Sequence, residues 1–595
     1  MPYQPENPLI VQGDRTVLLE AANAKYEEAR DAIGAIAELE KSPEHIHTYR
    51  ITPLSLWNAA SAGLTPDEAL EHLARLSKFD LPGNIVHDIR DYMSRYGRLR
   101  LLRSPEHGDK LVLTSVDPIL ITEIAHARKI KPYIVQVLDQ RTIEVHAGMR
   151  GHLKHALVEF GYPAEDLAGY VQGAALAIEL RDPTLTGRAF GLRHYQREAV
   201  DVFWASGGSK GGSGVVVLPC GAGKTVVALG TLVTAQTHTL IVCFGTNAVH
   251  QWINEILDKT SLTPEMIGEY TGELKEIRPI TVTTYQVLTY HPPKKRRAAA
   301  GDTGADAENM VKSRPIEEEF PHLGLFTSRD WGLIIYDEVH LLPAPVFRVT
   351  AEIQARRRLG LTATLVREDG RESDVFSLIG PKKYDLPWKT LEGQGWIATA
   401  DCWEVRVALP QELRMAYAVA EDGREKYRIA AENPEKLAAL DRLVAIHRDD
   451  NVLIIGQYLD QLHAIAERID APVITGKMPN REREKLYDAF RRGEITKLVV
   501  SKVANFAIDL PDANVAIQVS GTFGSRQEEA QRLGRILRPK AEGVLAHFYS
   551  IVTRDTNDQE FAARRQLFLT EQGYRYTILD ATELIERVQV AAGNN

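Results

Sequence analysis

The sequence predicts an α/β protein, with two tandem parallel-sheet domains that follow an α+β N-terminal region. The first observation is an alternation of short β-branched runs with helical stretches, which is typical of a parallel sheet wrapped by helices. The runs lie at 215–218, 240–244, 280–284, 333–336 and 359–362.

The second observation is that this pattern restarts after Trp403. Buried-strand candidates follow at 452–455, 472–474, 498–501 and 515–519. A single sheet with so many strands would be unusual, so two domains are expected, with a ligand site in the cleft between them.

The third observation is that the first 180 or so residues lack this pattern. They are rich in helical stretches at 21–40 and 55–93, and mixed afterwards.

Composition indicates an ordinary soluble globular protein, with 44% apolar and 25% charged residues among 595. No apolar run is long enough to cross a bilayer, and residues 1–13 do not resemble a secretory signal, so a cytoplasmic location is expected. Cys220, Cys243 and Cys402 lack the paired spacing of a zinc or iron-sulfur site. The net charge of -9 argues against non-specific coating of nucleic acid, but allows a locally basic groove.

Residues 218–225, Leu-Pro-Cys-Gly-Ala-Gly-Lys-Thr, form the clearest motif, between an apolar run and a helical stretch. Gly221 and Gly223 would let backbone N–H groups surround a phosphate chain at the helix N-terminus. Lys224 would reach the β and γ phosphates, and the Thr225 hydroxyl would bind magnesium. Leu218 stands where the general P-loop has Gly, which matches a shorter form. The alternative is a Gly-rich turn with a solvated lysine.

Two adjacent carboxylates follow the apolar run 331–336, in the sequence Asp-Glu-Val-His at 337–340. Asp337 would bind Mg²⁺ beside Thr225, and Glu338 would orient and deprotonate the attacking water. His340 would couple the nucleotide to the segments that follow. A simple helix cap is the alternative for the two acids.

A third element lies in the second domain, where Gln531, Arg535 and Arg538 fall on one helical face. Two guanidinium groups can neutralise charge on a γ-phosphoryl group, an effect on the order of 10³ to 10⁵ in rate where arginine fingers have been measured. Hydrolysis would then require the cleft to close. The alternative is a solvated basic helix.

The ordered set of motifs resembles the XPB family of superfamily 2 helicases, over roughly 192–549. The segments that carry the resemblance are Leu-Arg-His-Tyr-Gln at 192–196, Asp-Glu-Val-His at 337–340, Thr-Ala-Thr at 362–364, Arg-Glu-Asp at 367–369, 501–511 and 531–538. The resemblance implies two RecA-like motor domains, ATP and Mg²⁺ as cofactors, and DNA as the track. Ala504 departs from the Gly of many relatives, which puts a backbone contact of that motif in doubt.

The resemblance also implies residue roles. Gln196 would read the adenine edge with Arg193 nearby, and Asp509 would lie near the domain interface at the nucleotide. Thr362 and Thr364 would transmit closure. The nucleic acid would be contacted by the DNA-junction triplet Arg367, Glu368 and Asp369, and along its phosphates by Gln251, Trp252, Thr283 and Thr284.

The domain limits expected from the family are 1–105 for partner docking, 106–185 for a damage-recognition-like unit, 186–396 for motor domain 1 and 397–595 for motor domain 2, with a thumb-like element near 410–432. A partner nuclease is expected. Residues 291–319 carry a Lys-Lys-Arg-Arg run at 294–297 and an acidic end. A disordered surface insertion is favoured there over a basic DNA-contacting arm.

The expected function is an ATP-dependent DNA helicase or translocase that opens forked, bubble or damaged duplexes in repair. One alternative is an RNA helicase or a restriction translocase. Another is an ATP-gated scaffold that opens DNA locally and recruits a nuclease.

Overall fold

The computed structural model describes residues 3–41, 45–208, 211–219, 221–291, 320–353, 356–363, 372–501, 513–521 and 545–584. Several sequence predictions lie outside these residues, namely those for Cys220, Thr364, the 367–369 triplet, Ala504, Asp509, Gln531, Arg535, Arg538 and nearly all of the 291–319 insertion. None of the described helices has both the length and the apolar character needed to cross a bilayer.

The N-terminal unit has a four-stranded antiparallel sheet in the order β1-β2-β4-β3, with four helices against it. Its elements are β1 Leu9–Val11, β2 Thr16–Glu20, α1 Tyr26–Gly34, β3 Glu38–Lys41, β4 Ile46–Arg50, α2 Pro53–Ser61, α3 Pro66–Leu76 and α4 Gly83–Arg95. Thr52 and Thr65 each form a capping box ahead of a helix that starts with proline, which explains why α2 and α3 begin where they do.

The middle unit has a five-stranded sheet in the order β7-β8-β6-β5-β9. Its elements are β5 Leu99–Ser104, β6 Lys110–Ser115, α5 Pro118–His126, β7 Ile134–Asp139, β8 Thr142–Val145, α6 Arg150–Phe160 and β9 Ala164–Asp166. Strand β5, which the sequence-based boundary at residue 105 assigns to the first unit, is hydrogen-bonded along its length to β6.

Parallel-sheet domain 1 contains seven parallel strands in the order β12-β13-β11-β14-β15-β10-β16. The strands are β10 Ser213–Val217, β11 Thr239–Cys243, β12 Ile267–Tyr270, β13 Ile280–Thr284, β14 Leu333–Asp337, β15 Arg357–Thr362 and β16 Lys382–Asp385. The main helices are α7 His194–Trp204, α8 Lys224–Ala235, α9 Thr246–Lys259, α10 Tyr285–Leu288, α12 Ala344–Glu352, α13 Glu372–Leu378 and α14 Trp388–Gly393. The β-branched runs on either side of the sheet centre are fully buried, which confirms the predicted parallel sheet.

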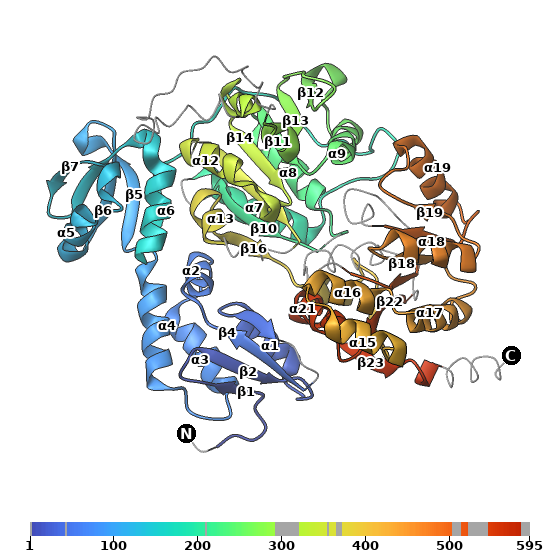
Figure 1. Ribbon diagram of the computed structural model, residues 1–595. Coiled ribbons are helices and arrows are strands. Elements are labelled where there is room, and N and C mark those ends of the chain that lie inside the picture. Colours follow the sequence, from blue (N-terminus) through green and yellow to red (C-terminus); the bar gives the residue numbers. More distant parts are fainter. Residues whose placement is uncertain are drawn as a thin grey trace, which may run out of the picture.

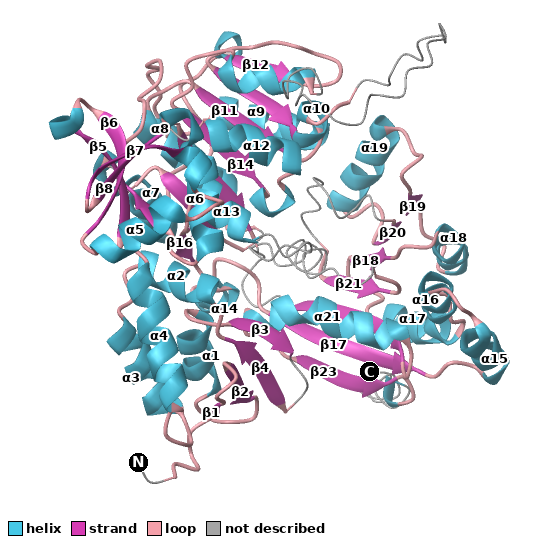
Figure 2. Cartoon of the chain, turned by 60° about the vertical axis from the view of Figure 1, so that its left-hand side comes forward, coloured by secondary structure: helices cyan, strands magenta, loops and turns pink. Residues whose placement is uncertain are grey.

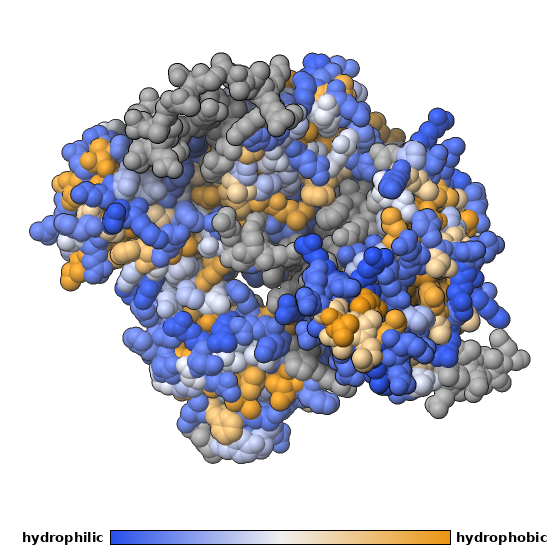
Figure 3. Space-filling view, in the orientation of Figure 1, coloured by the Kyte–Doolittle hydropathy of each residue, from blue (hydrophilic) through white to orange (hydrophobic). Residues whose placement is uncertain are grey.

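Parallel-sheet domain 2 repeats the design, with the order β19-β20-β18-β21-β22-β17-β23. Its strands are β17 Ala400–Val407, β18 Val452–Ile455, β19 Val473–Ile474, β20 Lys497–Val500, β21 Val515–Gln518, β22 Ala546–Thr553 and β23 Tyr576–Asp580. Its helices are α15 Gln411–Val419, α16 Gly423–Ala431, α17 Glu435–Ile446, α18 Leu459–Arg468, α19 Asn480–Arg491 and α21 Asn557–Glu571. The segment 410–432, predicted to be a thumb-like element, forms the helices α15 and α16. Met415 and Val419 of α15 have exposed apolar side chains, and Figure 3 shows an apolar patch on the surface in the region of these helices.

The two parallel-sheet domains lie side by side, and the N-terminal unit lies below domain 1 and beside β23 of domain 2 (Figures 1 and 2). On domain 1, the Lys382 backbone N–H donates to the Asn58 side chain at 3.1 Å. On domain 2, the Leu39 backbone N–H donates to Glu571 at 3.1 Å, and Leu567 packs into the N-terminal core. The N-terminal unit therefore contacts both domains directly.

Candidate nucleotide site

The predicted phosphate loop connects the end of β10 to the start of α8 at Lys224. Gly221 and Gly223 have φ values of 83° and 84°, in the left-handed region that favours glycine. A Cβ atom at Gly223 would also lie 2.5 Å from the amide nitrogen of Gln196. The backbone of this loop thus requires glycine at Gly223 for two independent reasons.

Gln196 supports the loop from α7 and is only 3% exposed. Its Nε2 donates to the Ala222 carbonyl at 2.9 Å, and its Oε1 accepts from the Arg193 backbone N–H at 2.9 Å. The Tyr195 hydroxyl donates to the same Ala222 carbonyl at 2.7 Å. The Arg193 guanidinium lies 4.4 Å from the ring centroid of Trp396. The segment 192–196 is therefore built directly onto the phosphate loop.

The acidic pair stands at the carboxyl end of β14, as predicted from the apolar run before it. Lys224 Nζ lies 3.1 Å from Glu338 Oε1, and this ion pair joins the two motifs across the sheet edge. Glu338 has a φ of 50°, which is a strained backbone conformation for a residue other than glycine. Strain of this kind is concentrated at functional sites.

The two carboxyl groups have opposite electrostatic settings. Burial and the neighbouring Glu338 raise the pKa of Asp337 to about 6, because both disfavour its charge. Burial also acts to raise the pKa of Glu338, but Lys224 and His340 outweigh it and the pKa of Glu338 is lowered. Glu338 is therefore stabilised as an anion by its cationic neighbours. Asp337 is less favoured as an anion, and a bound cation would stabilise its charged form.

The residues expected to hold magnesium fit that ion. Mg²⁺ prefers oxygen ligands, often one or two carboxylates together with substrate phosphates. Asp337 supplies a half-buried carboxylate, and Thr225, in the first turn of α8, carries a hydroxyl. Among the described residues, no cluster of three His, Cys, Asp or Glu side chains is arranged to bind a metal.

His340 connects the acidic pair to β15. Its ring is 4% exposed, with Nδ1 2.8 Å from Thr362 Oγ1 and 3.4 Å from Glu338 Oε2. Thr362 is the last residue of β15, and its carbonyl accepts from the Leu218 backbone N–H at 3.0 Å. The structure thus brings the 362 position into contact with both nucleotide motifs.

The four residues assigned to nucleic-acid phosphates are placed differently from one another. Gln251 is exposed on α9, whereas Trp252, Thr283 and Thr284 are at most 3% exposed. The indole of Trp252 donates to Asp337 Oδ2 at 2.9 Å, because the apolar face of α9 turns it toward the end of β14. Trp252 is therefore a support of the acidic pair in this structure, not a surface residue.

Sequence reasoning missed a second aromatic support. The Tyr285 hydroxyl donates to the Asp337 backbone carbonyl at 3.0 Å from the start of α10. Tyr195 anchors the phosphate loop, a role that the motif at 192–196 does not by itself indicate. A Tyr or Trp beside a motif carries a polar tip that needs a partner when buried, but spacing does not identify that partner.

Family models match most of the chain. One described as ERCC3/RAD25/XPB C-terminal helicase matches residues 391–593, one described as helicase conserved C-terminal domain matches 9–139, and one described as type III restriction enzyme, res subunit, matches 189–367. The chain is similar over 588 residues to "DNA 3'-5' helicase XPB" of Kineococcus radiotolerans, at 54% identity covering 99% of both chains.

Two further relatives extend this similarity. "DNA 3'-5' helicase XPB" of Mycobacterium tuberculosis is 53% identical over 98% of this chain and 99% of its own. "Putative DNA 3'-5' helicase Rad25" of Halobacterium salinarum is 34% identical over 90% of this chain and 81% of its own. The phosphate loop, the acidic pair and full-length similarity agree, and the chain belongs to the XPB family of helicases.

Proposed function

We propose that this protein is an ATP-hydrolysing DNA helicase or translocase that moves 3' to 5' and opens duplex DNA in repair, with Mg²⁺ as its metal cofactor. The Lys224–Glu338 ion pair carries the proposal, because it brings the phosphate-binding lysine and the candidate general base together at one sheet edge. The names of the relatives, which print a DNA 3'-5' helicase, support the substrate and the polarity.

The ion pair also suggests how binding prepares hydrolysis. Lys224 would move from Glu338 to the β and γ phosphates, since a phosphate carries more charge than one carboxylate. Glu338 would then be released to orient the attacking water and accept its proton. Asp337 and Thr225 would hold Mg²⁺, which neutralises phosphate charge when bound. His340, through Thr362, would report this change to β15.

Parallel-sheet domain 2 would complete the site. We assign Arg535 and Arg538 to the γ phosphate, Gln531 to their positioning, and Asp509 to the interface, on the strength of the family motifs. Gln196 would exchange its bond to Ala222 for one to adenine, with Arg193 nearby. Closure would thereby depend on the bound nucleotide.

DNA contacts are proposed on both domains. The 367–369 triplet and Thr364 would act at the duplex junction and in coupling, and Gln251 is the exposed candidate for a phosphate contact. Helices α15 and α16 would form the thumb-like grip near 410–432. We propose functional domains at 1–105, 106–185, 186–396 and 397–595, with docking of a partner nuclease in the first. The first border moves to before β5, since that strand pairs with β6.

The test is ATP turnover and strand displacement with single-stranded, duplex, forked and bubble DNA, and with RNA. Lys224→Ala is expected to lower ATP turnover about 100-fold or more, because the phosphate charge loses its main partner. Lys129→Ala, which removes a side chain that is 79% exposed, is the matched control and should leave turnover unchanged. A 3' single-stranded tail should be required for unwinding.

Other outcomes would replace the proposal. Unwinding that persists in Lys224→Ala would mean that hydrolysis does not drive opening, as in the scaffold alternative. Stimulation by RNA as strong as by DNA would favour the RNA helicase.

A further inference from the structure

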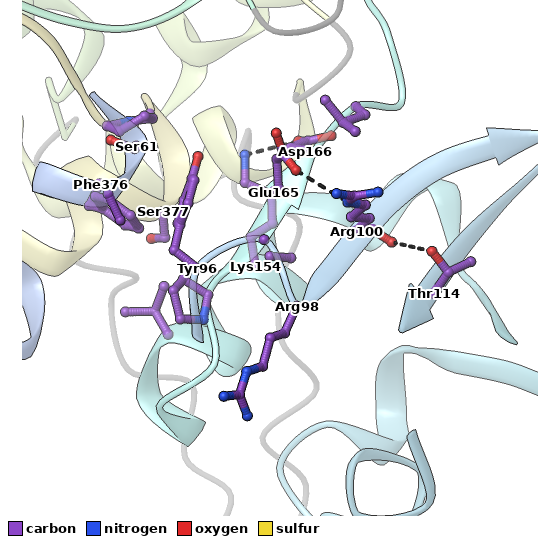
Figure 4. A pocket seen from close by; sticks show the side chains of 18 of the residues that line it. Ser61, Tyr96, Arg98, Arg100, Thr114, Lys154, Glu165, Asp166, Phe376 and Ser377 are labelled. Carbon is purple, nitrogen blue, oxygen red and sulfur yellow. Dashed lines mark hydrogen bonds and ion pairs between the residues drawn. The ribbon is translucent and has the colours of Figure 1, made fainter. Parts of the chain in front are cut away.

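A cavity of about 780 Å³ lies where the N-terminal unit, the middle unit and parallel-sheet domain 1 meet (Figure 4). Ser61 lies on the N-terminal unit side, Thr114 on the middle unit, and Phe376 on domain 1. Its volume falls within the range of small-molecule sites. None of the described phosphate-loop or acidic-pair residues lines it, so it is separate from the nucleotide site.

The lining is basic. Five cationic side chains and two carboxylates line the cavity, namely Arg98, Arg100, Arg141, Lys154 and Lys383 against Glu165 and Asp166. Arg100 pairs with Glu165 at 3.4 Å, and Lys154 with Asp166 at 3.1 Å (Figure 4). These pairs account for both carboxylates.

Arg98 and Arg141 remain available for an anion. The Arg98 guanidinium donates to the Ser94 carbonyl at 3.1 Å and to its hydroxyl at 2.8 Å, and both are neutral acceptors. Arg141 is exposed on the turn into β8. Within the described ranges, no carboxylate forms an ion pair with either guanidinium. Hydroxyl groups that line the cavity, such as those of Thr114 and Ser377, add further hydrogen-bonding capacity.

Lys154 and Asp166 of the lining also belong to a buried charge cluster, which includes Arg150 and Arg358 outside the lining. Asp166 lies 2.6 Å from Arg150 and 3.1 Å from Lys154, and it also interacts with the buried Arg358 of β15. One carboxylate thus faces three cations. Burial, together with Arg358 and Arg150, outweighs Asp166 and lowers the pKa of Lys154 to about 8. Positive potential therefore extends to the cavity wall, where an anion would reduce it.

We propose that this cavity binds the phosphate group of a nucleotide-sized ligand, through Arg98 and Arg141, at a site distinct from the ATP site. The same chemistry could come from a free mononucleotide or from the 5'-phosphate end of a DNA strand. Since three units line the cavity, the bound ligand holds them in the present arrangement. Binding to the folded state alone raises the unfolding temperature as ligand concentration rises.

The experiment uses the full chain carrying Lys224→Ala, so that the ATP site contributes little phosphate affinity. The probes are inorganic phosphate, deoxyadenosine monophosphate, and a four-nucleotide DNA with either a 5'-phosphate or a 5'-hydroxyl, measured by calorimetry and thermal shift. The phosphorylated probe should bind at least about tenfold more tightly than its hydroxyl counterpart, because charge-assisted hydrogen bonds are lost. Preference for the tetranucleotide over the mononucleotide would identify a strand end as the source.

The variants define the site. Arg98→Gln with Arg141→Gln should weaken phosphate binding at least about tenfold. Arg103→Gln is the matched control, since Arg103 lies in the same unit and faces Asp109 at 3.7 Å instead of the cavity. Arg141→Glu alone changes an exposed side chain and should also weaken binding, even if the double variant is unstable.

Equal binding by wild-type and variant sites, or no binding of any phosphorylated probe at millimolar concentration, would overturn the proposal. These measurements need no ATP hydrolysis. A negative result would therefore leave the proposed helicase function standing.

Discussion

At the scale of single residues, Lys436 and Asp558 form an ion pair at 2.6 Å in the interior of parallel-sheet domain 2, with side chains 0% and 1% exposed. Lys436 also donates to the Val519 carbonyl, so the buried ammonium group has a neutral acceptor as well as its carboxylate partner. Lys436→Met would leave the buried Asp558 carboxylate with the Thr553 backbone N–H at 3.0 Å and the more distant Arg565 guanidinium at 3.9 Å. We expect a loss of about 3 to 5 kcal/mol in the free energy of unfolding, measured in urea. Recovery is expected when Asp558→Leu is added, and a single variant as stable as wild type would contradict this.

The buried His47 predicts a pH dependence. Burial and the nearby Arg575 lower its pKa to about 4. Below about pH 6.5 the unfolded chain binds a proton at this histidine, whereas the folded chain does not until about pH 4. The contribution of neutral His47 to the free energy of unfolding is therefore complete above pH 6.5. It is lost as the pH falls toward 4, by up to about 1.4 kcal/mol per pH unit.

Thermal unfolding of wild type and His47→Gln between pH 7 and 4 tests this. As the pH is lowered, the unfolding temperature of the wild type should fall more steeply than that of His47→Gln. Parallel curves would show that another group controls the acid sensitivity.

Trp252 separates two roles. Trp252→Phe removes the indole hydrogen bond to Asp337 but keeps the apolar packing of α9. Loss of a hydrogen bond to a charged group costs about 1.5 to 3 kcal/mol, so ATP turnover should fall roughly 10- to 100-fold. DNA affinity measured without nucleotide should not change, because the side chain is buried. A loss of DNA affinity with unchanged ATP turnover would instead support the prediction that Trp252 contacts the phosphates of the nucleic acid.

At the scale of elements, α6 of the middle unit packs closely on α12 of parallel-sheet domain 1. A side chain at Gly151 would collide with the Ala351 backbone, so Gly151→Ala should destabilise this contact by about 1 to 3 kcal/mol. Gly148→Ala is the matched control, because a Cβ there would meet nothing within 4 Å. Differential scanning calorimetry should register a shift only for Gly151→Ala.

Elements also mark how far the sequence could be interpreted. The run at 333–336 predicted both a buried strand and the position of Asp337 at its end, because parallel strands carry their functional groups at the carboxyl edge. The role of Trp252 could not be obtained in this way. Helical spacing identifies the buried face of α9 but not the group that its indole contacts. Strand β5 was separated from its sheet because a strand pattern does not name its partners.

At the scale of the whole molecule, nine predicted strand runs, five in the first series and four in the second, were enough to predict two parallel sheets. The placement of the N-terminal unit could not be predicted. Its contacts are single polar pairs, such as Asn58 with Lys382, and a few apolar side chains such as Leu567. Such contacts leave no periodic signal in the sequence.

The N-terminal unit is hydrogen-bonded to Lys382 of parallel-sheet domain 1 and to Glu571 of parallel-sheet domain 2. The peptide through α14 is one connection between the two lobes, and the N-terminal unit makes a second, which closes a loop of contacts. Relative movement of the two lobes would have to bend or break one of these two connections, so the N-terminal unit is expected to narrow the range of positions that the lobes can take.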